Sequence, residues 1–100
     1  MLNLYRLEIK MKSMDEQIHK CLLGILQRGI TEARSYALVG ENKIAADLLD
    51  ALDNLPRHLA NWTPNSELEI AEQFYTFKKQ HPDHVTDFAA ILRQRKQVLY

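Results

Sequence analysis

The sequence is short of the residues that mark several common protein classes. Its single cysteine, Cys21, excludes an intramolecular disulfide. Three glycines and three prolines in 100 residues exclude collagen-like and other low-complexity chains. No apolar run approaches the roughly 20 residues of a membrane-spanning helix. The first residues also lack the apolar core and cleavage site of a signal peptide. We therefore expect a cytoplasmic protein with no membrane partner.

An excess of charge of one sign is also missing. Thirteen Lys and Arg balance thirteen Asp and Glu, so no overall field draws the chain to nucleic acid. The charge is nevertheless segregated. Residues 1–40 carry six cations and four anions, residues 41–76 carry two and seven, and residues 77–100 carry five and two. Such segregation favours either a surface that orients a cationic partner or helices that neutralise one another within the domain.

The residues that are present predict a single globular domain made of helices. The composition is 46% hydrophobic and 26% charged, which is typical of a folded chain of this length. Apolar residues recur with the period of an amphipathic helix in four segments. We predict a compact all-α four-helix domain, in which an antiparallel hairpin (about 14–39 and 42–55) packs with two further helices (about 65–80 and 83–98).

Glycine, proline and helix-capping residues predict where these helices begin and end. Gly40 is positioned to end the first helix in a left-handed conformation, and Gly29 would let the second helix approach closely. We predict that Ser13 caps the start of the first helix and that the second helix ends before Pro56. The third helix should begin at Thr63 or at Ser66, and Asp83 should cap the fourth. We expect an irregular connection over PRHLANWTPN. The predicted buried arcs include Ile30, Leu49, Leu68, Tyr75 and Val85.

Residues 1–12 form a leader that differs from the helical domain, residues 13–100. Its apolar and polar side chains alternate with a period of two, which is typical of a strand. No second strand-like segment is present to pair with it. We expect a flexible or weakly ordered leader. The alternatives are a backward extension of the first helix, an upstream addition, or a dimer contact through Tyr5, Leu7, Ile9 and Met11.

Three aspartates, Asp47, Asp50 and Asp53, follow one another at intervals of three residues in the second predicted helix. Neighbours at this spacing have Cβ atoms about 5–6 Å apart, near enough for a metal site or an acid–base pair. Such a site also needs further ligands and a pocket that excludes water. Lys43 precedes Asp47 by one turn, as in a surface ion pair. We therefore interpret the aspartates as the solvated side of the helix, with a protein-docking face as the functional alternative.

The segment HPDH, from His81 to His84, superficially resembles a set of metal ligands. His81 precedes a proline and is expected to be extended, so the two imidazoles need not converge. Zinc sites recruit further histidines or cysteines, and those of this chain are scattered. We expect structural roles for both histidines, with no metal and no cofactor.

Motifs of catalysis and of phosphate binding are missing too. Cys21 and His19 are two residues apart and hence on different sides of a helix, so we expect Cys21 to be a small buried hydrophobe. The sequence has no glycine-rich phosphate loop and no nucleophile elbow. Arg93, Arg95 and Lys96 lie where a helix dipole favours cations in any case. We therefore expect neither an enzyme nor a protein whose main partner is nucleic acid.

The segment ARSYALVGENKIAADLLDALDNLPRHL resembles part of a group of small helical bacterial proteins with the pattern A-x-x-x-A…G…A-x-x-L-x-x-A-L-x-N-[LI]-P. The hairpin also resembles one tetratricopeptide unit, although no second copy follows. The first resemblance covers about a quarter of the chain and implies a helical architecture without an established activity. The matching residues are Ala33, Ala37, Gly40, Ala45, Leu48, Ala51, Leu52, Asn54, Leu55 and Pro56.

These features lead to the expectation of a small, non-enzymatic protein-binding module. Its most specific form is an immunity-protein or antitoxin-type inhibitor of a cationic toxin domain, because an anionic helix face can occupy a phosphate-binding surface. One alternative is a homodimeric structural or regulatory protein, and a more remote one is a nucleic-acid-binding accessory protein. The expected contact residues are Asp47, Asp50, Asp53, Glu69 and Glu72.

Overall fold

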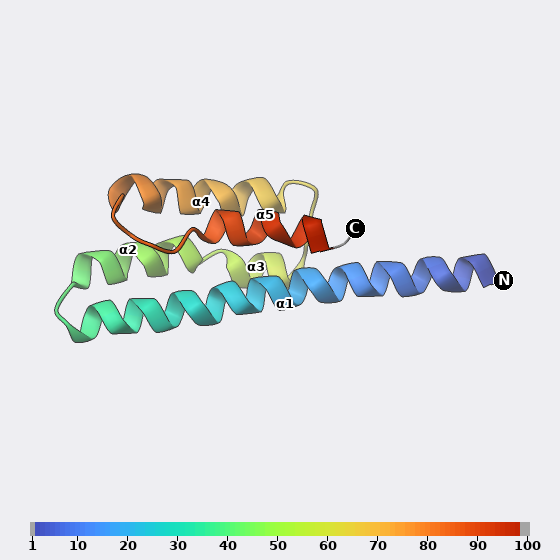
Figure 1. Cartoon of the computed structure of the whole chain (residues 1–100), viewed down its shortest axis with the longest axis horizontal. Coiled ribbons are helices and arrows are strands. Elements are labelled where there is room, and N and C mark those ends of the chain that lie inside the picture. Colours follow the sequence, from blue (N-terminus) through green and yellow to red (C-terminus); the bar gives the residue numbers. More distant parts are fainter. Residues whose placement is uncertain (1, 99–100) are drawn as a thin grey trace.

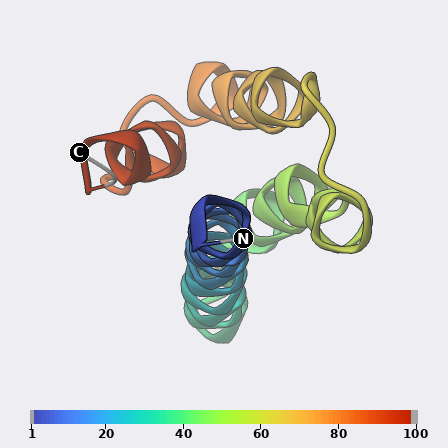
Figure 2. The ribbon, with the colours of Figure 1, turned by 90° about the vertical axis from the view of Figure 1, so that its right-hand side faces the viewer.

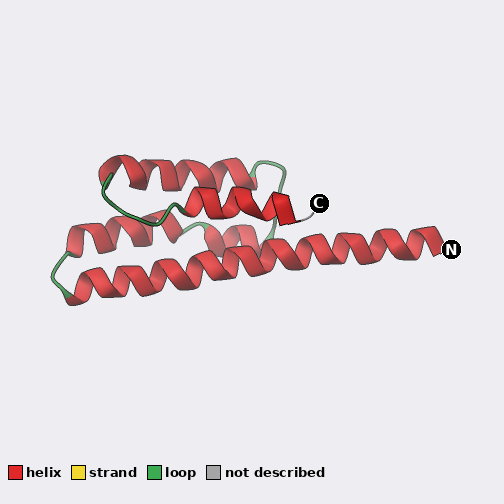
Figure 3. Cartoon of the chain, viewed as in Figure 1, coloured by secondary structure: helices red, strands yellow, loops and turns green. Residues whose placement is uncertain are grey.

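The chain is helical over the part that the structure describes. A computed structural model describes the backbone of residues 2–98 and the side chains of residues 16–94. The elements are α1 (Leu2–Leu38), α2 (Asn42–Leu52), α3 (Leu55–Ala60), α4 (Ser66–Gln80) and α5 (Phe88–Val98). No strand occurs among the described residues (Figure 3), so the predicted all-α class is confirmed. Four longer helices build the domain, and α3 is a short addition.

The helices α1 and α2 form the predicted antiparallel hairpin (Figure 1). Gly40 joins them with a φ of +84°, in the left-handed region that glycine adopts without steric cost. The N–H of Gly40 donates to the carbonyl O of Ala37 at 3.1 Å, and the N–H of Glu41 donates to the carbonyl O of Tyr36 at 2.8 Å. These two hydrogen bonds make a Schellman motif, so Gly40 ends α1 as predicted.

The two helices of the hairpin are in tight contact at Gly29. A Cβ atom added to Gly29 would lie 2.6 Å from Cδ1 of Leu52, well inside the distance at which carbon atoms pack. Ala33, one turn further along α1, is also buried. The absence of a side chain at Gly29 therefore sets the spacing of the hairpin, which confirms the prediction.

Helices α4 and α5 cover the hairpin and share one core with it. α4 packs against α2, and α5 contacts both α1 and α4 (Figure 2). The rings of Phe74 on α4 and Phe88 on α5 stack with their centroids 5.1 Å apart. Every helix contributes a fully buried side chain to this core, namely Leu22, Leu48, Leu55, Ile70 and Leu92.

The first helix is much longer than predicted. It begins at Leu2, so Ser13 lies inside it, and the backbone of residues 2–12 takes the backward extension that the sequence left open. A helix of 37 residues is about 56 Å long, which accounts for the longest dimension of 58 Å. Its N-terminal part projects beyond the other helices (Figure 1). Although α1 is long, neither it nor any other described helix has the apolar length that crossing a membrane requires.

The connection after α2 contains a helix that was not predicted. α2 ends at Leu52, and α3 begins at Leu55 with Pro56 in its first turn. Proline suits this place because the first N–H groups of a helix have no intrahelical partner. The proline therefore marks the start of a new helix, and the predicted irregular segment is shortened to the residues around Trp62.

Two other helix starts differ from the prediction. α5 begins at Phe88, where Oδ1 of Asp87 accepts the N–H of Ala90 at 3.0 Å, so Asp87 and not Asp83 caps this helix. α4 begins at Ser66 as one alternative predicted, but the Ser66 hydroxyl contacts Nδ1 of His58 at 2.9 Å instead of capping the helix. The Ser66 hydroxyl is thus engaged by a side chain of α3.

Five large apolar side chains that were predicted to be buried are exposed. Their exposed fractions are 40% for Ile30, 49% for Leu49, 62% for Leu68, 54% for Tyr75 and 94% for Val85. Val85 differs because the chain is not yet helical there. Ile30 and Leu49 lie at the edges of the apolar arcs of their helices. Leu68 and Tyr75 lie on the side of α4 that is turned away from its buried residues Ile70 and Phe74.

Candidate functional site

The three aspartates of α2 do not share one environment. Asp47 is buried, with 9% of its surface exposed, whereas Asp50 and Asp53 are exposed. The prediction of a solvated face is therefore wrong for Asp47 and confirmed for the other two. The difference arises because α2 packs against α1 and α4 at once, so that two of its sides are covered.

Asp47 fixes the end of α4 to α2. Its Oδ2 accepts a hydrogen bond from Nε2 of His81 at 2.7 Å, and its Oδ1 accepts one from Nζ of Lys43 at 3.2 Å. These hydrogen bonds, that from His81 above all, hold the pKa of Asp47 below the ordinary value of 3.8 despite the opposing effect of burial. The carboxylate thus has internal partners for both of its oxygens.

The remaining predicted contact residues divide into two groups. Glu69 on α4 is held within the chain, because its Oε2 lies 3.1 Å from Nη2 of Arg57 and 3.2 Å from Nε2 of His58. Asp50, Asp53 and Glu72 are exposed, and none of the described cationic side chains pairs with them. Three carboxylates on two packed helices therefore face solvent without neutralisation.

A second carboxylate site, at the half-buried Glu32, lies beside α5. Glu32 on α1 accepts hydrogen bonds from Nε2 of His84 at 2.8 Å, from Oγ1 of Thr86 at 2.9 Å and from Nε of Arg28 at 3.2 Å. Nδ1 of His84 lies 3.1 Å from the carbonyl O of Thr86, so both ring nitrogens face acceptors. The sequence signalled Glu32 only through Arg28 one turn before it, and Thr86 was not identified.

The segment HPDH does not bring its histidines together. His81 binds Asp47 on α2, whereas His84 binds Glu32 on α1, so each imidazole serves a different helix. No group of three or more potential metal ligands is assembled among the described side chains. Pro82 and Asp83, with Tyr36 and Ile44, line a hollow of about 330 Å³ beside these pairs. Both histidines thus attach the α4–α5 connection, residues 81–87, to the hairpin.

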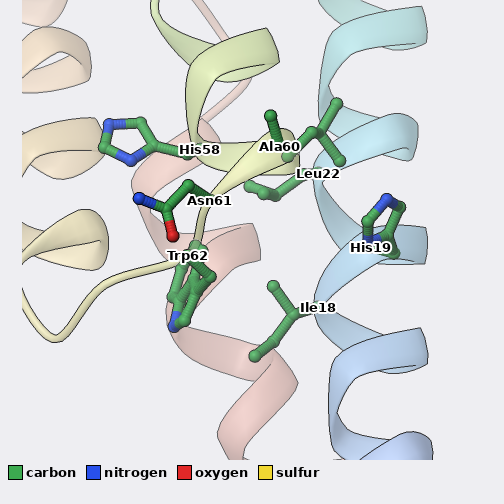
Figure 4. A pocket seen from close by; sticks show the side chains of 8 residues that line it. Ile18, His19, Leu22, His58, Ala60, Asn61 and Trp62 are labelled. Atoms are coloured by element: carbon green, nitrogen blue, oxygen red, sulfur yellow. The ribbon is translucent and has the colours of Figure 1, made fainter.

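Another pocket lies between α1 and the end of α3 (Figure 4). It has a volume of about 300 Å³, and Ile18 and Leu22 of α1 extend toward Trp62 across it. His58 is turned away from these side chains, toward Ser66 of α4. Apolar side chains such as Ile18 and Trp62 therefore share the lining of the pocket with polar ones such as His19 and Asn61. The buried imidazole of His58 contacts Ser66 through Nδ1.

Two further predicted sites fall partly or wholly outside the described side chains. The leader residues Tyr5, Leu7, Ile9 and Met11 lie outside them, so a dimer contact there stays a prediction, as does a flexible leader. Of the basic cluster, the side chain of Arg93 is described, and its Nη1 donates to the hydroxyl of Tyr75 at 3.2 Å. Cys21 is half-buried rather than buried, with its Sγ 4.0 Å from the carbonyl O of Ile91.

Known proteins offer no template for these sites. Comparison with models of protein families, with curated proteins and with solved structures found no match to this chain. A function therefore has to be argued from the chain's own contacts, charges and exposed surfaces.

Proposed function

We propose that this chain is a non-enzymatic module that binds a cationic partner protein through the exposed acidic face of α2 and α4. By the acidic face we mean three exposed carboxylates that we propose the partner contacts together, namely Asp50 on α2, Asp53 at the C-terminal end of α2 and Glu72 on α4. In its most specific form the module is an immunity-protein or antitoxin-type inhibitor. The partner's lysines and arginines would then pair with carboxylates that the chain itself leaves unpaired.

The observation that carries this proposal is the division of the acidic residues into two groups. Asp47 and Glu69 have internal partners at 2.7–3.2 Å, and they join α2 and α3 to α4. Asp50, Asp53 and Glu72 lie on the same helices but have no cationic partner among the described side chains. The first group holds the backbone of α2 and α4 in place, and the second group is thereby presented on a rigid support. Pre-organised charges bind with less loss of conformational entropy.

Exposed carboxylates of this kind act chiefly on association. They raise the rate of encounter with a cationic surface and make that rate depend on salt, while contributing less to the final affinity than desolvated pairs do. An inhibitor that must reach its target quickly benefits from this property. The proposal therefore predicts binding that is fast at low salt and slower at high salt.

The test is the double variant Asp50→Asn/Asp53→Asn with its partner. The partner is obtained by cross-linking the chain in cells of its source, identified by mass spectrometry and then purified. Association is measured by surface plasmon resonance at about 50 and about 300 mM salt. We expect the variant to associate about tenfold more slowly at the lower salt, and the difference to shrink at the higher salt.

A matched control separates the acidic face from net charge. Glu16→Gln/Asp83→Asn also removes two exposed carboxylates, but from α1 and from the α4–α5 connection. It should leave the association rate close to that of the unaltered chain. Equal rates for the two double variants, or rates that do not depend on salt, would contradict binding through the acidic face.

A further inference from the structure

An apolar groove runs between α4 and α5 on the side away from α1. It has a volume of about 370 Å³, and the buried side chains of Ala89 and Leu92 lie at its α5 side. Leu68 and Tyr75 of α4 also line it, although 62% and 54% of their surfaces remain exposed. Figure 2 shows that no other helix lies over this outer side of α4. Two large apolar side chains thus stand beside an apolar floor in contact with solvent, which is typical of an interaction surface.

The lining residues in α4 and just before it follow a regular pattern. Pro64, Leu68, Ala71 and Tyr75 are separated by four, three and four residues, which is the spacing of a seam along which a second helix packs. The pattern alternates in size near its centre, since the large ring of Tyr75 follows the methyl group of Ala71 by one turn. A helix that places a large side chain over Ala71 and a small one under Tyr75 would fit this seam.

The charges of α4 indicate what that second helix is. The first half of α4 carries Glu67 and Glu72, and its last turn carries Lys79. Glu69 and Lys78 also lie on α4, where they have partners within the chain, in Arg57 and in the carbonyl O of His84. A copy of α4 that runs antiparallel places acidic half against basic half at both ends. A parallel copy would place like charges side by side. The antiparallel copy also supplies Ala71 opposite Tyr75 and Tyr75 opposite Ala71.

From these features we infer that the groove binds a second copy of this chain, with the two α4 helices antiparallel about a two-fold axis near Gln73. Tyr75 of each copy packs over Ala71 of the other, and Glu67 of each copy lies level with Lys79 of the other. Both copies contribute the same residues to the interface, as in most homodimers with a two-fold axis. It does not use Asp50 or Asp53 of the acidic face, so the inference does not rest on the proposed function.

The first test compares two equivalent substitutions at exposed leucines. Sedimentation velocity of the full chain between about 5 and about 500 µM should show a monomer–dimer equilibrium with a dissociation constant on the order of 10–100 µM, as suits a small interface. Leu68→Lys should raise this constant at least about tenfold. Leu49→Lys, at a similarly exposed leucine outside the groove, should leave it unchanged. Circular dichroism melting checks that both variants fold.

The second test addresses the antiparallel arrangement. Lys79→Glu should weaken the dimer, and Glu67→Lys in the same chain as Lys79→Glu should restore it, because both members of the pair are then reversed. A chain that stays monomeric at about 500 µM would overturn the inference, even if it bound a designed amphipathic helix. A dimer whose dissociation constant does not change with Leu68→Lys would also overturn it, since that dimer would use another surface. The same holds if Glu67→Lys does not restore the dimer that Lys79→Glu weakens.

Discussion

The hairpin and the α4–α5 connection are fixed by different kinds of contact. The hairpin is held by apolar packing between α1 and α2, which are neighbours along the chain, around the missing side chain of Gly29. The connection, residues 81–87, is held by hydrogen bonds from His81 to Asp47 and from His84 to Glu32. These bonds span 34 and 52 residues of sequence. Short-range apolar patterns therefore determine one region, and long-range polar pairs determine the other.

This difference has a consequence for stability. The stabilisation from apolar packing is roughly proportional to the buried area, and the packing tolerates small adjustments. When one member of a hydrogen-bonded pair is removed, the other is left without its partner and the contribution of the whole pair is lost. We therefore expect the connection to be more sensitive to a single polar substitution than the hairpin is to a single added methyl group.

The largest effect should come from His84→Ala. The substitution leaves Glu32 without its closest donor and removes a ring whose centroid is 4.8 Å from that of Phe77 and 6.0 Å from that of Phe88. We expect the free energy of unfolding, measured with urea at neutral pH, to fall by about 2–3 kcal/mol.

His19→Ala is the matched control for this prediction. His19 is exposed on α1, so its removal should change the free energy of unfolding by less than about 0.5 kcal/mol. An equal loss in the two variants would mean that the buried pair contributes no more than an exposed histidine. The α4–α5 connection would then not be more sensitive to a single polar substitution than other parts of the chain.

A smaller effect of known sign should come from the two glycines inside α1. Gly24→Ala meets nothing within 4 Å, so better helix propensity should raise the free energy of unfolding by about 0.5–1 kcal/mol. Gly29→Ala gains the same propensity but forces its methyl group against Leu52, so it should lower that free energy by about 1–2 kcal/mol. Thermal and urea unfolding measure both. If Gly29→Ala were also stabilising, the hairpin would adjust its spacing freely and Gly29 would not set it.

The hairpin was predictable because its signals are local. Gly40 and the apolar period of α2 act within a few residues, and Gly29 acts on the next helix of the chain, which the short turn at Gly40 brings back against it. The start of α5 was not predictable in the same way. Asp83 and Asp87 are equally good caps by type, and the choice depends on Thr86 and His84 reaching Glu32 on a distant helix.

The sequence predicted which residues belong to the candidate site, but not which of them are buried and which are exposed. A helical wheel places Asp47, Asp50 and Asp53 on one polar side, and nothing in the sequence distinguishes the aspartate that α4 covers. The distinction follows from the partner, because His81 at the end of α4 lies opposite Asp47 and leaves Asp50 in solvent. Likewise, the apolar arc of α4 does not reveal that Leu68 and Tyr75 remain uncovered.

The smallest effect, and one that disappears in acid, should come from Asp47→Asn. The hydrogen bond from His81 holds the pKa of Asp47 in the folded chain below the ordinary value of 3.8, to which it returns on unfolding. The folded state therefore binds this proton more weakly than the unfolded state. The resulting stabilisation is complete above about pH 4 and is lost as the pH falls through the lower, folded-state pKa.

Asp47→Asn should accordingly lower the free energy of unfolding near neutral pH, and its difference from the unaltered chain should shrink as the pH falls below about 4. Urea unfolding between about pH 2.5 and 7 measures this difference. Asp50→Asn makes the same change of charge one turn away, at a carboxylate without an internal partner, and should shift the unfolding free energy at neutral pH by less than about 0.5 kcal/mol. A loss for Asp47→Asn that is constant across this pH range would show that the substitution acts through packing and not through the carboxylate. Asp47 would then contribute through packing between α2 and α4. His84 with Glu32 would be the one long-range polar pair that stabilises the α4–α5 connection.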